Sequence, residues 1–271
     1  MLEQAKDASD YTPDKGYHIK GLLTGESGSG KTTGTMSLPG KKLLIDLDGR
    51  AESVAGFPDL RILKILEPNA KKPTAWEELN EVLNDLWEVK DECEESKDPF
   101  PYTSIIIDGL TMAGRYAMNW VMEKAITNDG KKLSRGPGGS PSQPHYQPQM
   151  TMFAKTVLGF IPLPCHIVFT SHLDLYQDKQ LGTLKYYPKV IGNTRTEVSN
   201  WFNETYECVR EEGSNGVEYQ WNTVGIGRTG FIKSSLNALG KYWDDPIVVD
   251  FDKEPVGFQK LLDIRFKKGG K

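Results

Sequence analysis

The sequence predicts an α/β fold in which a mainly parallel β-sheet is flanked by helices, with a β-hairpin extension toward the C-terminus. Short apolar runs, several of them rich in Ile and Val, recur along the chain and are typical of buried strands. Segments with helical periodicity separate most of the early runs, which is the pattern of β-α-β units. A glycine-rich segment at 25–32 joins the first apolar run to the first helical segment.

This glycine-rich segment has the sequence GESGSGKT and fits the pattern G-x-x-x-x-G-K-[ST]. Its three glycines let the backbone curl so that successive amide N–H groups point at phosphate oxygens. Lys31 adds positive charge, and Thr32 can place its hydroxyl on Mg²⁺ at the positive end of the following helix. A Gly/Ser linker can match by chance, but the strand before and the helix after favour a phosphate-binding loop. The predicted nucleotide contacts are Gly25, Glu26, Ser27, Gly28, Ser29, Gly30, Lys31, Thr32 and Thr33.

Hydrophobic periodicity and turn residues predict the order of the elements. The predicted strands cover 18–24, 42–48, 60–66, 104–108, 165–171 and 247–251, and a hairpin joins 204–210 to 217–223. The predicted helices cover 31–37, 74–92, 112–126, 150–160 and 256–266, and a capping box of Thr74 and Glu77 opens the second of them.

Two polar segments interrupt these elements. Residues 127–149 are rich in Gly, Pro, Ser and Gln, a composition that buries too little apolar surface to order itself, so we expect a mobile loop. We expect a second mobile loop at 174–195. The chain is then divided into an N-terminal tail at 1–17, one core at 18–235, and a strand and helix at 236–271 that extend the same domain.

Composition narrows the class of protein. The 271 residues are 38% hydrophobic and 26% charged, as in ordinary folded proteins. No apolar run approaches the roughly 20 residues that span a bilayer, so we expect no membrane contact and a cytoplasmic location. The net charge of -4 argues against indiscriminate nucleic-acid binding but leaves room for a local basic groove. The cysteines lie far apart without metal-ligand spacing, which predicts neither disulfides nor zinc.

An acid ends the most apolar run of the chain. Residues 105–107 are all Ile and precede Asp108, which places a carboxylate at the carboxyl end of a buried strand. Beside a phosphate-binding loop such a carboxylate holds Mg²⁺ through water, so Thr32 and Asp108 are the predicted metal residues and ATP·Mg²⁺ is the predicted ligand. Gly109 follows Asp108, so the adjacent Glu that many ATPases have at this place is missing.

A carboxylate that activates water must therefore come from another strand. Asp46 and Asp48 end the second predicted strand, and parallel strands present their carboxyl ends to the same crevice. We favour Asp48 for this role, with Glu52 behind it. In the alternative interpretation one acid caps the turn at Gly49 and the other is solvated.

These motifs resemble those of RecA-type ATPases, whose catalytic Glu stands in an Ile-Asp-x-Glu pattern at the end of the second strand. The present chain has Ile-Asp-Leu-Asp at 45–48, one methylene shorter, so its carboxylate must come closer through the backbone or act through another water. Residues 168–172, VFTSH, resemble the strand that ends in a polar sensor of the γ-phosphate, which makes His172 the sensor candidate. The alternative is a strand-end histidine with local hydrogen bonds. A further resemblance, over roughly residues 18–235, is to phage-encoded compact RecA-like ATPases found with single-strand annealing recombinases.

The resemblance implies contacts with single-stranded DNA and with neighbouring subunits. Cations would track the DNA phosphates and tyrosines would stack on bases. The candidates in 127–149 are Lys131, Lys132, Arg135, His145 and Tyr146, and those in 174–195 are Tyr176, Lys179, Lys185, Tyr186, Tyr187, Lys189 and Arg195. Arg228 and Lys233 are the candidates to reach a neighbour's γ-phosphate. Solvated loops and an ordinary surface turn are the alternatives.

The sequence thus favours an ATPase that hydrolyses ATP with Mg²⁺ and acts with single-stranded DNA in phage-type recombination or repair. Its catalytic candidates are Lys31, Asp48, His172, Arg228 and Lys233. The resemblance implies a homo-oligomer, a single-strand annealing or single-strand binding protein as partner, and the cytoplasm of a bacterial host. The alternatives are a nucleotide-dependent assembly protein with little hydrolysis, and a P-loop kinase, which would need an Arg-rich lid that we do not find. The guanine-selective Asn-Lys-x-Asp pattern is absent, which leaves the choice between ATP and GTP open.

Overall fold

The computed structural model describes residues 16–69, 72–126, 130–177, 182–213, 216–249 and 257–266. The predicted tail at 1–17 lies outside the described residues except for its last two. Parts of the two predicted loops and of the C-terminal extension also lie outside them.

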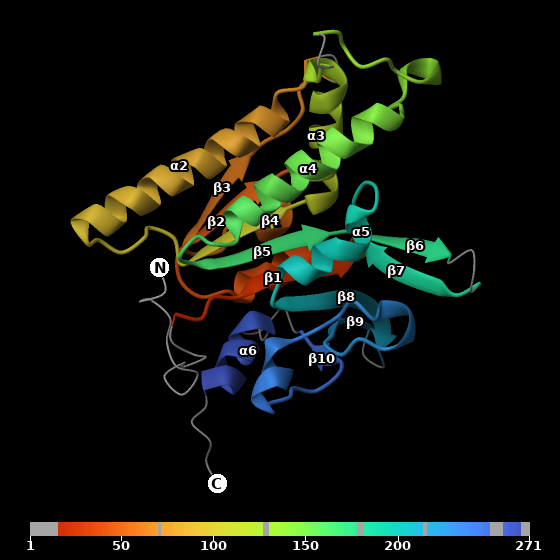
Figure 1. Ribbon diagram of the computed structural model, residues 1–271. Helices are drawn as coiled ribbons and strands as arrows, with labels where there is room; N and C mark the ends of the chain where they lie inside the picture. Colours follow the sequence, from red (N-terminus) through yellow and green to blue (C-terminus); the bar gives the residue numbers. More distant parts are fainter. Residues whose placement is uncertain are drawn as a thin grey trace, which may run out of the picture.

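An eight-stranded sheet forms the centre of the molecule, with the strand order β10-β9-β8-β1-β5-β4-β2-β3 (Figure 1). From β8 to β3 all neighbouring strands are parallel, and β9 pairs antiparallel with both β8 and β10. This confirms the predicted mainly parallel sheet and its C-terminal hairpin. The strands are β1 Lys20–Gly25, β2 Lys42–Asp46, β3 Leu60–Lys64, β4 Ser104–Asp108, β5 His166–Ser171, β8 Glu204–Gly213, β9 Gly216–Asn222 and β10 Ile247–Val248.

The parallel register brings several polar residues to one edge of the sheet. Asp46 on β2 lies opposite Asp108 on β4, and Asp108 lies opposite Thr170 on β5. On the other side of β5, Ser171 lies opposite Thr24 of β1. The loop that follows β1 therefore begins beside these side chains, because the carboxyl ends of parallel strands meet at the same edge.

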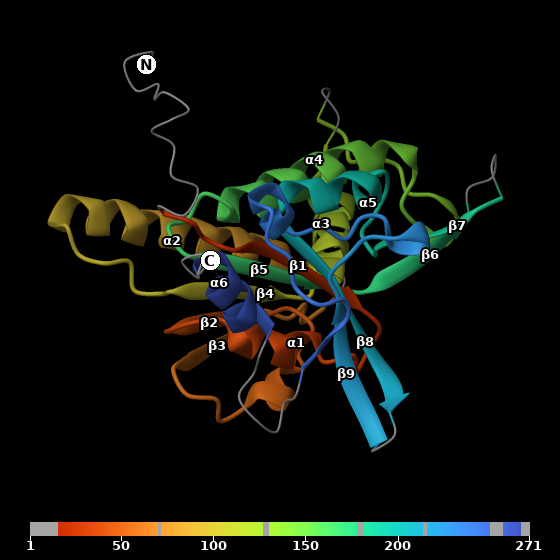
Figure 2. The same ribbon diagram turned by 90° about the horizontal axis from the view of Figure 1, so that it is seen from below.

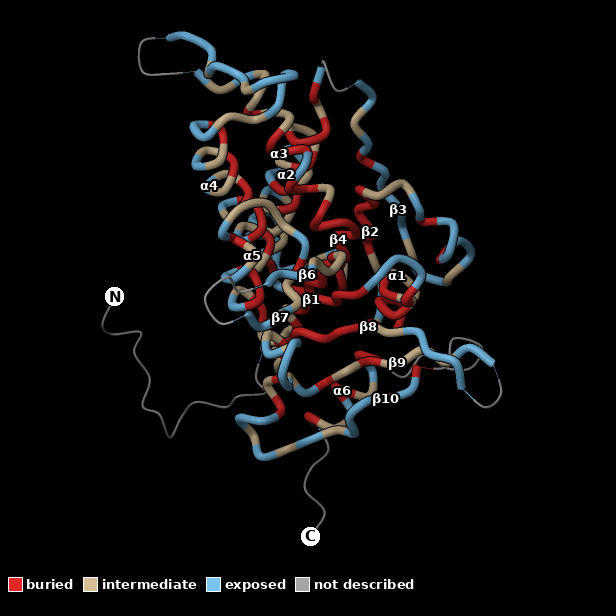
Figure 3. The backbone as a smooth tube through the Cα atoms, turned by 90° about the vertical axis from the view of Figure 1, so that its right-hand side faces the viewer, coloured by how far each residue is buried: buried red, intermediate tan, exposed pale blue. Residues whose placement is uncertain are grey.

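Helices cover both faces of the sheet (Figures 1 and 2). The helices α2 (Ala75–Ser96), α3 (Leu110–Lys124) and α4 (Gln143–Phe160) lie on one face. The other face carries the single turn α1 (Lys31–Gly34), the 3₁₀ turn Thr35–Ser37 that follows it, and α6 (Gly257–Phe266). Because strand side chains alternate, the four strands β1, β2, β4 and β5 contribute buried side chains to the cores on both faces. In contrast, β3 and the far ends of β8 and β9 are exposed (Figure 3).

The predicted loop at 127–149 is wrong over its last residues, because α4 begins at Gln143 and not at 150. The backbone N–H of Ser142 donates to Nδ1 of His145 at 3.0 Å, and Pro144 stands in the first turn. These are helix start signals that the Pro-rich and Gln-rich composition concealed. The side chain of Gln149 is buried, and its amide donates to the carbonyl of Gly114 in α3 at 3.3 Å.

The predicted capping box of α2 is also wrong. Thr74 is the residue before the helix, but its side chain makes no capping hydrogen bond. Glu77 instead accepts a hydrogen bond from Nε1 of Trp120 at 2.9 Å and lies 3.6 Å from the ammonium of Lys124. The Glu77 carboxylate therefore contacts side chains of α3 and does not cap α2 as the local pattern predicted.

The predicted loop at 174–195 is wrong in its described part, which holds a two-stranded hairpin and the one-turn helix α5 (Thr194–Glu197). Strands β6 (Leu173–Gln177) and β7 (Leu184–Pro188) pair antiparallel and project beyond the end of β5 (Figure 1). The rings of Tyr176 and Tyr187 meet edge to face with their centroids 6.2 Å apart. This aromatic pair across the two strands stabilises a hairpin whose polar composition gave no strand signal.

A buried carboxylate ties the first described residues to the last helix. Glu204, at the start of β8, accepts hydrogen bonds from Tyr17 Oη at 2.7 Å, from the Ser235 N–H at 3.2 Å, and from the hydroxyl of Tyr206. The guanidinium of Arg265 in α6 lies 3.6 Å from the Tyr17 ring centroid and donates to Ser235 Oγ at 3.0 Å.

The substitution Glu204→Ala should lower the free energy of unfolding by about 3 kcal/mol, because it leaves several buried donors without an acceptor. Urea denaturation followed by circular dichroism measures this loss. Glu211→Ala, on the exposed part of the same strand, is the control and should change stability by less than about 0.5 kcal/mol. Equal effects of the two substitutions would contradict the role given to Glu204.

Candidate nucleotide-binding site

A pocket of about 310 Å³ lies at the carboxyl edge of the sheet, above β1, β4 and β5. It is lined by the loop after β1, the start of α1, the connection after β2, and single residues at the end of β4, directly after β5 and in the middle of β9. These residues are Ser27, Gly28, Gly30, Lys31, Thr32, Thr33, Asp48, Arg50, Ser53, Asp108, His172 and Tyr219. The fold thus gathers most of the loop residues predicted to bind nucleotide, both predicted metal residues, and three of the predicted catalytic residues.

The loop after β1 has the backbone that phosphate binding requires. Gly25, Gly28 and Gly30 have φ values of 152°, 78° and 79°, a region that side chains disfavour. At Gly25 a Cβ atom would also lie 2.3 Å from the carbonyl oxygen of Cys208 on β8. The curled loop therefore depends on glycine both for its conformation and for its close contact with β8.

Lys31 lies beneath the first half of this loop. Its ammonium donates to the carbonyl oxygens of Gly25 at 3.0 Å and Glu26 at 2.6 Å. Burial lowers the pKa of Lys31, while the carboxylates of Asp108 and Asp48 act in the opposite direction. The ammonium is thus held at the part of the loop where a lysine of this pattern contacts β- and γ-phosphates.

Thr32 and Asp108 form a pair of oxygen donors beside the loop. The Thr32 hydroxyl donates to Asp108 Oδ2 at 2.8 Å, and the Thr170 hydroxyl donates to Asp108 Oδ1. Burial raises the pKa of Asp108, and the two hydroxyl donors oppose that rise. Mg²⁺ fits such a place, because it is commonly held by one or two protein oxygens together with substrate phosphates. Within the described ranges no group of three or more His, Cys, Asp or Glu side chains could hold a metal by itself.

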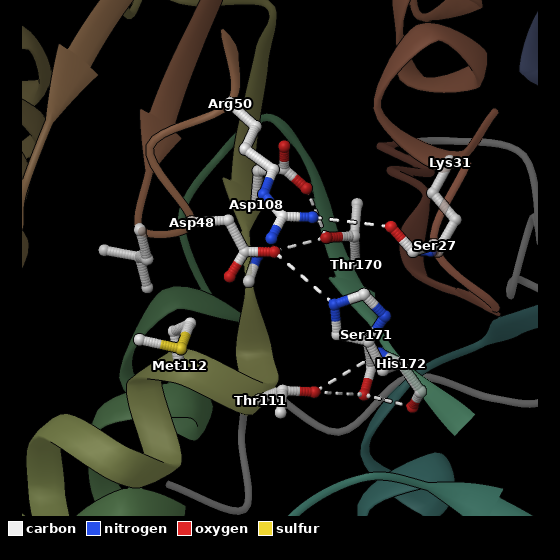
Figure 4. Close-up of polar contacts among 12 residues, drawn as sticks. Ser27, Lys31, Asp48, Arg50, Asp108, Thr111, Met112, Thr170, Ser171 and His172 are labelled. Atoms are coloured by element: carbon white, nitrogen blue, oxygen red, sulfur yellow. Dashed lines mark hydrogen bonds and ion pairs between the residues drawn. The ribbon is translucent and has the colours of Figure 1, made fainter. Parts of the chain in front are cut away.

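Asp46 and Asp48 have different surroundings. Asp46 is fully buried, and its carboxylate accepts the backbone N–H groups of Gly49 at 2.7 Å and of Arg50 and Ala51 at 3.2 Å each. It is therefore the acid that caps the turn. Asp48 is not simply solvated, since its side chain is 18% exposed and points into the pocket (Figure 4).

Gly109 explains how Asp48 reaches the pocket. A Cβ atom at Gly109 would lie 2.6 Å from Asp48 Oδ1, and the φ of Gly109 is 115°. The glycine that stands where many ATPases have Glu thus makes room for the carboxylate of the neighbouring strand. Glu52, expected behind Asp48, is exposed and pairs with Lys64 at 3.5 Å, so it does not support Asp48.

His172 faces Asp48 across the pocket. Its Nε2 lies 3.7 Å from Asp48 Oδ2 (Figure 4). Its backbone N–H donates a hydrogen bond to Thr111 Oγ1 at 3.2 Å. The local hydrogen bond of the alternative interpretation is therefore present, but it involves the backbone. The ring remains directed at the pocket.

Three lining residues escaped the sequence interpretation. Arg50 reaches from the turn after β2 to the loop, where its Nη1 lies 3.4 Å from Ser27 Oγ. Ser53 lies in the 3₁₀ turn Ala51–Val54, and Tyr219 lies on β9. Arg50 directly follows Asp48 and Gly49 in the connection after the second strand, and this position beside the predicted catalytic acid is the signal that could have identified it.

Arg228 and Lys233 do not line the pocket of their own chain. Arg228 lies in the 3₁₀ turn Gly227–Thr229, which contacts β7. The backbone of Lys233 forms an isolated β-bridge with Thr205 on β8, and Thr205 in turn lies opposite Leu22 on β1. The backbone of Lys233 is therefore level with the middle of β1 and not with the phosphate-binding loop that follows this strand. Their action on a neighbouring subunit stays a prediction.

The predicted DNA contacts in the first polar segment are weakened by the structure. His145 is fully buried in α4, so the prediction that it contacts DNA is wrong. Arg135 pairs with Glu123 of α3, and Lys132 lies 3.7 Å from the same carboxylate. The two cations therefore neutralise an acid of their own chain.

The hairpin β6–β7 is the better candidate for DNA contact. Tyr176 is 38% exposed, and the guanidinium of Arg195 lies 4.8 Å from its ring centroid. Lys185 and Lys189 are exposed on and beside β7, whereas Lys179 lies outside the described residues. The described hairpin thus combines aromatic rings with cations.

Comparison with known families agrees with this geometry. A family model described as an AAA domain matches residues 18–226, which include every element of the pocket. The chain belongs to the AAA domain family. Membership makes it a P-loop ATPase-type domain and supports nucleotide binding at this pocket. No curated protein matches the chain.

One further structural finding concerns membranes. None of the helices in the described part of this AAA domain combines the length and the apolar character needed to cross a bilayer.

Thr170→Val should weaken Mg²⁺-dependent nucleotide binding about tenfold, because it removes the hydroxyl that orients Asp108 while keeping the shape of the side chain. Calorimetric titration with ADP, with and without Mg²⁺, measures this effect. The affinity for ADP without Mg²⁺ should stay unchanged. An equal loss in both titrations would mean that Thr170 acts on the loop and not through Asp108.

Proposed function

We propose that this AAA domain hydrolyses ATP by attack of water on the γ-phosphate, and that it couples hydrolysis to single-stranded DNA in the manner of RecA-type recombination ATPases. The observation that carries the proposal is the Asp48–His172 pair, which lies in the same pocket as Lys31, Thr32 and Asp108. A carboxylate and an imidazole in contact beside a phosphate-binding loop suit proton removal from water and detection of the terminal phosphate.

Different residues of the pocket bind the phosphates and Mg²⁺. The loop amides and Lys31 hold the phosphates, and Thr32 and Asp108 offer oxygen atoms to Mg²⁺. Mg²⁺ held by these two residues would offset the negative charge of the phosphates. Thr170 keeps the Asp108 carboxylate in place through its hydroxyl.

Asp48 orients and deprotonates the attacking water. The Asp side chain is shorter than that of Glu, so its backbone must lie closer to the water. Gly109 allows this close approach, since any side chain there would collide with Asp48 Oδ1. His172 lies beside Oδ2 and Gly109 leaves room for Oδ1, so the carboxylate is held in place from two sides. A general base in such a position contributes roughly 10²- to 10⁴-fold to the rate.

Asp48→Asn should keep ATP binding within about threefold and lower turnover at least 100-fold, because the amide cannot accept the proton of water. Steady-state phosphate release and equilibrium nucleotide titration measure the two quantities. Glu52→Gln is the control, since it removes an exposed acid from the same connection. Unchanged turnover in the Asp48 variant would rule out the assignment, and tight ATP binding with negligible turnover of the unmodified chain would favour an assembly protein.

The position of His172 supports coupling to DNA. It is the single residue between β5 and β6, so the group that faces Asp48 is joined directly to the hairpin that carries Tyr176 and Tyr187. The Lys189 N–H donates to the His172 carbonyl at 2.7 Å, which ties both arms of the hairpin to this residue. A change at the terminal phosphate can therefore reach the hairpin through one residue.

The double substitution Tyr176→Ala/Tyr187→Ala should weaken binding of oligo-dT at least tenfold and remove its stimulation of ATP turnover, because stacking contributes about 1 to 3 kcal/mol per base. Fluorescence anisotropy and phosphate release with oligo-dT measure both effects, and basal turnover should stay unchanged. Tyr242→Ala is the matched control, since that ring is 70% exposed and lies outside the hairpin. DNA stimulation that survives the double substitution would contradict the assignment of the hairpin.

A further inference from the structure

We propose that Arg50 is a catalytic residue that binds the γ-phosphate from within the same chain and stabilises the negative charge of the transition state. This inference rests on the proposed hydrolysis of ATP. It differs from the sequence-based expectation, in which Arg228 and Lys233 supply the extra positive charge from a neighbouring subunit.

The backbone of Arg50 is fixed by a buried acid. The Asp46 carboxylate accepts three consecutive backbone N–H groups, from Gly49, Arg50 and Ala51. Gly49 has a φ of 71°, which lets the chain turn sharply at this point. The base of the Arg50 side chain is therefore positioned by the core of the sheet, although its guanidinium is exposed.

The guanidinium lies at the end of the pocket where the terminal phosphate belongs. Its Nη1 is 3.4 Å from Ser27 Oγ (Figure 4). Ser27 directly follows Gly25 and Glu26, whose carbonyl oxygens hold the Lys31 ammonium. A lysine of this motif contacts the β- and γ-phosphates, so Arg50 and Lys31 approach the same region from two sides.

The hydrogen bond to Ser27 is long and exposed, and a phosphate is a stronger partner for the guanidinium. Arginine offers a planar set of N–H donors that binds two phosphate oxygens at once and keeps its charge at any ordinary pH. Replacing the neutral Ser27 hydroxyl by phosphate oxygens thus converts a weak contact into a charge-assisted one.

The side-chain charges of the pocket favour such a group. Among the described residues that line it, Lys31 and Arg50 carry the positive side-chain charges, and Asp48 and Asp108 carry negative ones. Without Arg50 the side chains would oppose one positive charge to two negative ones, and Mg²⁺ alone would have to offset the remaining charge of a polyanionic substrate.

Arg50 acts during the bond exchange at phosphorus. The water oxygen forms a bond to the γ-phosphorus, its proton passes to Asp48, and the bond from that phosphorus to the bridging oxygen of ADP breaks. Negative charge increases on oxygens that the Arg50 guanidinium contacts, so the contact is stronger in the transition state than in the ground state.

The test compares Arg50→Gln and Arg50→Lys with Arg210→Gln. Arg210 is a matched control, because its Nη1 would lie 3.6 Å from a Cβ atom at Gly28 on the same loop, yet it does not line the pocket. All three variants are checked for native melting temperature by circular dichroism. Phosphate release gives turnover, and calorimetry with Mg²⁺ gives the affinities for ADP and for the non-hydrolysable analogue AMP-PNP.

Arg50→Gln should lower turnover 100-fold or more and weaken AMP-PNP about tenfold, while ADP binding stays within twofold. Arg50→Lys should recover only part of the turnover, because an ammonium cannot contact two oxygens in one plane. Turnover of Arg50→Gln equal to that of Arg210→Gln, or an equal loss of ADP and AMP-PNP affinity, would overturn the proposal. If the unmodified chain does not turn over ATP, the proposed function fails, and the AMP-PNP and ADP affinities still decide whether Arg50 binds the γ-phosphate.

Discussion

The site depends on the register of three neighbouring parallel strands, in which Asp46, Asp108 and Thr170 lie side by side. Burial favours this register, since a shift by one residue would turn the polar side chains of Ser104 and Asp108 toward the core that Ile105 and Ile107 fill. Because the three polar residues share one level, Thr170 can orient Asp108, and Asp46 can fold the following turn back toward the pocket. The apolar core of the sheet therefore sets the positions of the polar groups at its edge.

The two acids at the end of β2 have complementary tasks that follow from their different burial. Asp46 uses its carboxylate on backbone N–H groups and so defines the path of the turn. That turn directs Asp48 toward His172 and Arg50 toward Ser27. A substitution of Asp46 would consequently disturb both pocket residues at once, although Asp46 itself does not line the pocket.

Much of this arrangement could be predicted from the sequence, because the responsible signals are local. The glycine-rich loop, the acid after three isoleucines and the strand before His172 each lie within a few residues. The start of α4 also has local signals in Ser142, His145 and Pro144, but the polar composition around them concealed it. The β6–β7 hairpin and the orientation of Glu77 could not be predicted in this way, because they depend on contacts between side chains farther apart, as between Tyr176 and Tyr187 or between Glu77 and Trp120. The pairing of Asp48 with His172 also joins residues far apart in the chain, and only the fold brings them together.

Gly109 determines both the position of the Asp48 carboxylate and the contact between two segments of the chain. Its lack of a side chain admits the Asp48 carboxylate over the end of β4, between the turn after β2 and the end of β5. Asp48 and His172 thus make contact across the end of β4, which lies between β2 and β5. Asp48 belongs to the turn that also holds Arg50, and His172 leads directly into the β6–β7 hairpin. A larger residue at 109 would push the carboxylate away and separate both segments at once. The glycine that stands where many ATPases have Glu therefore connects the Arg50 end of the pocket with the hairpin through the contact between Asp48 and His172.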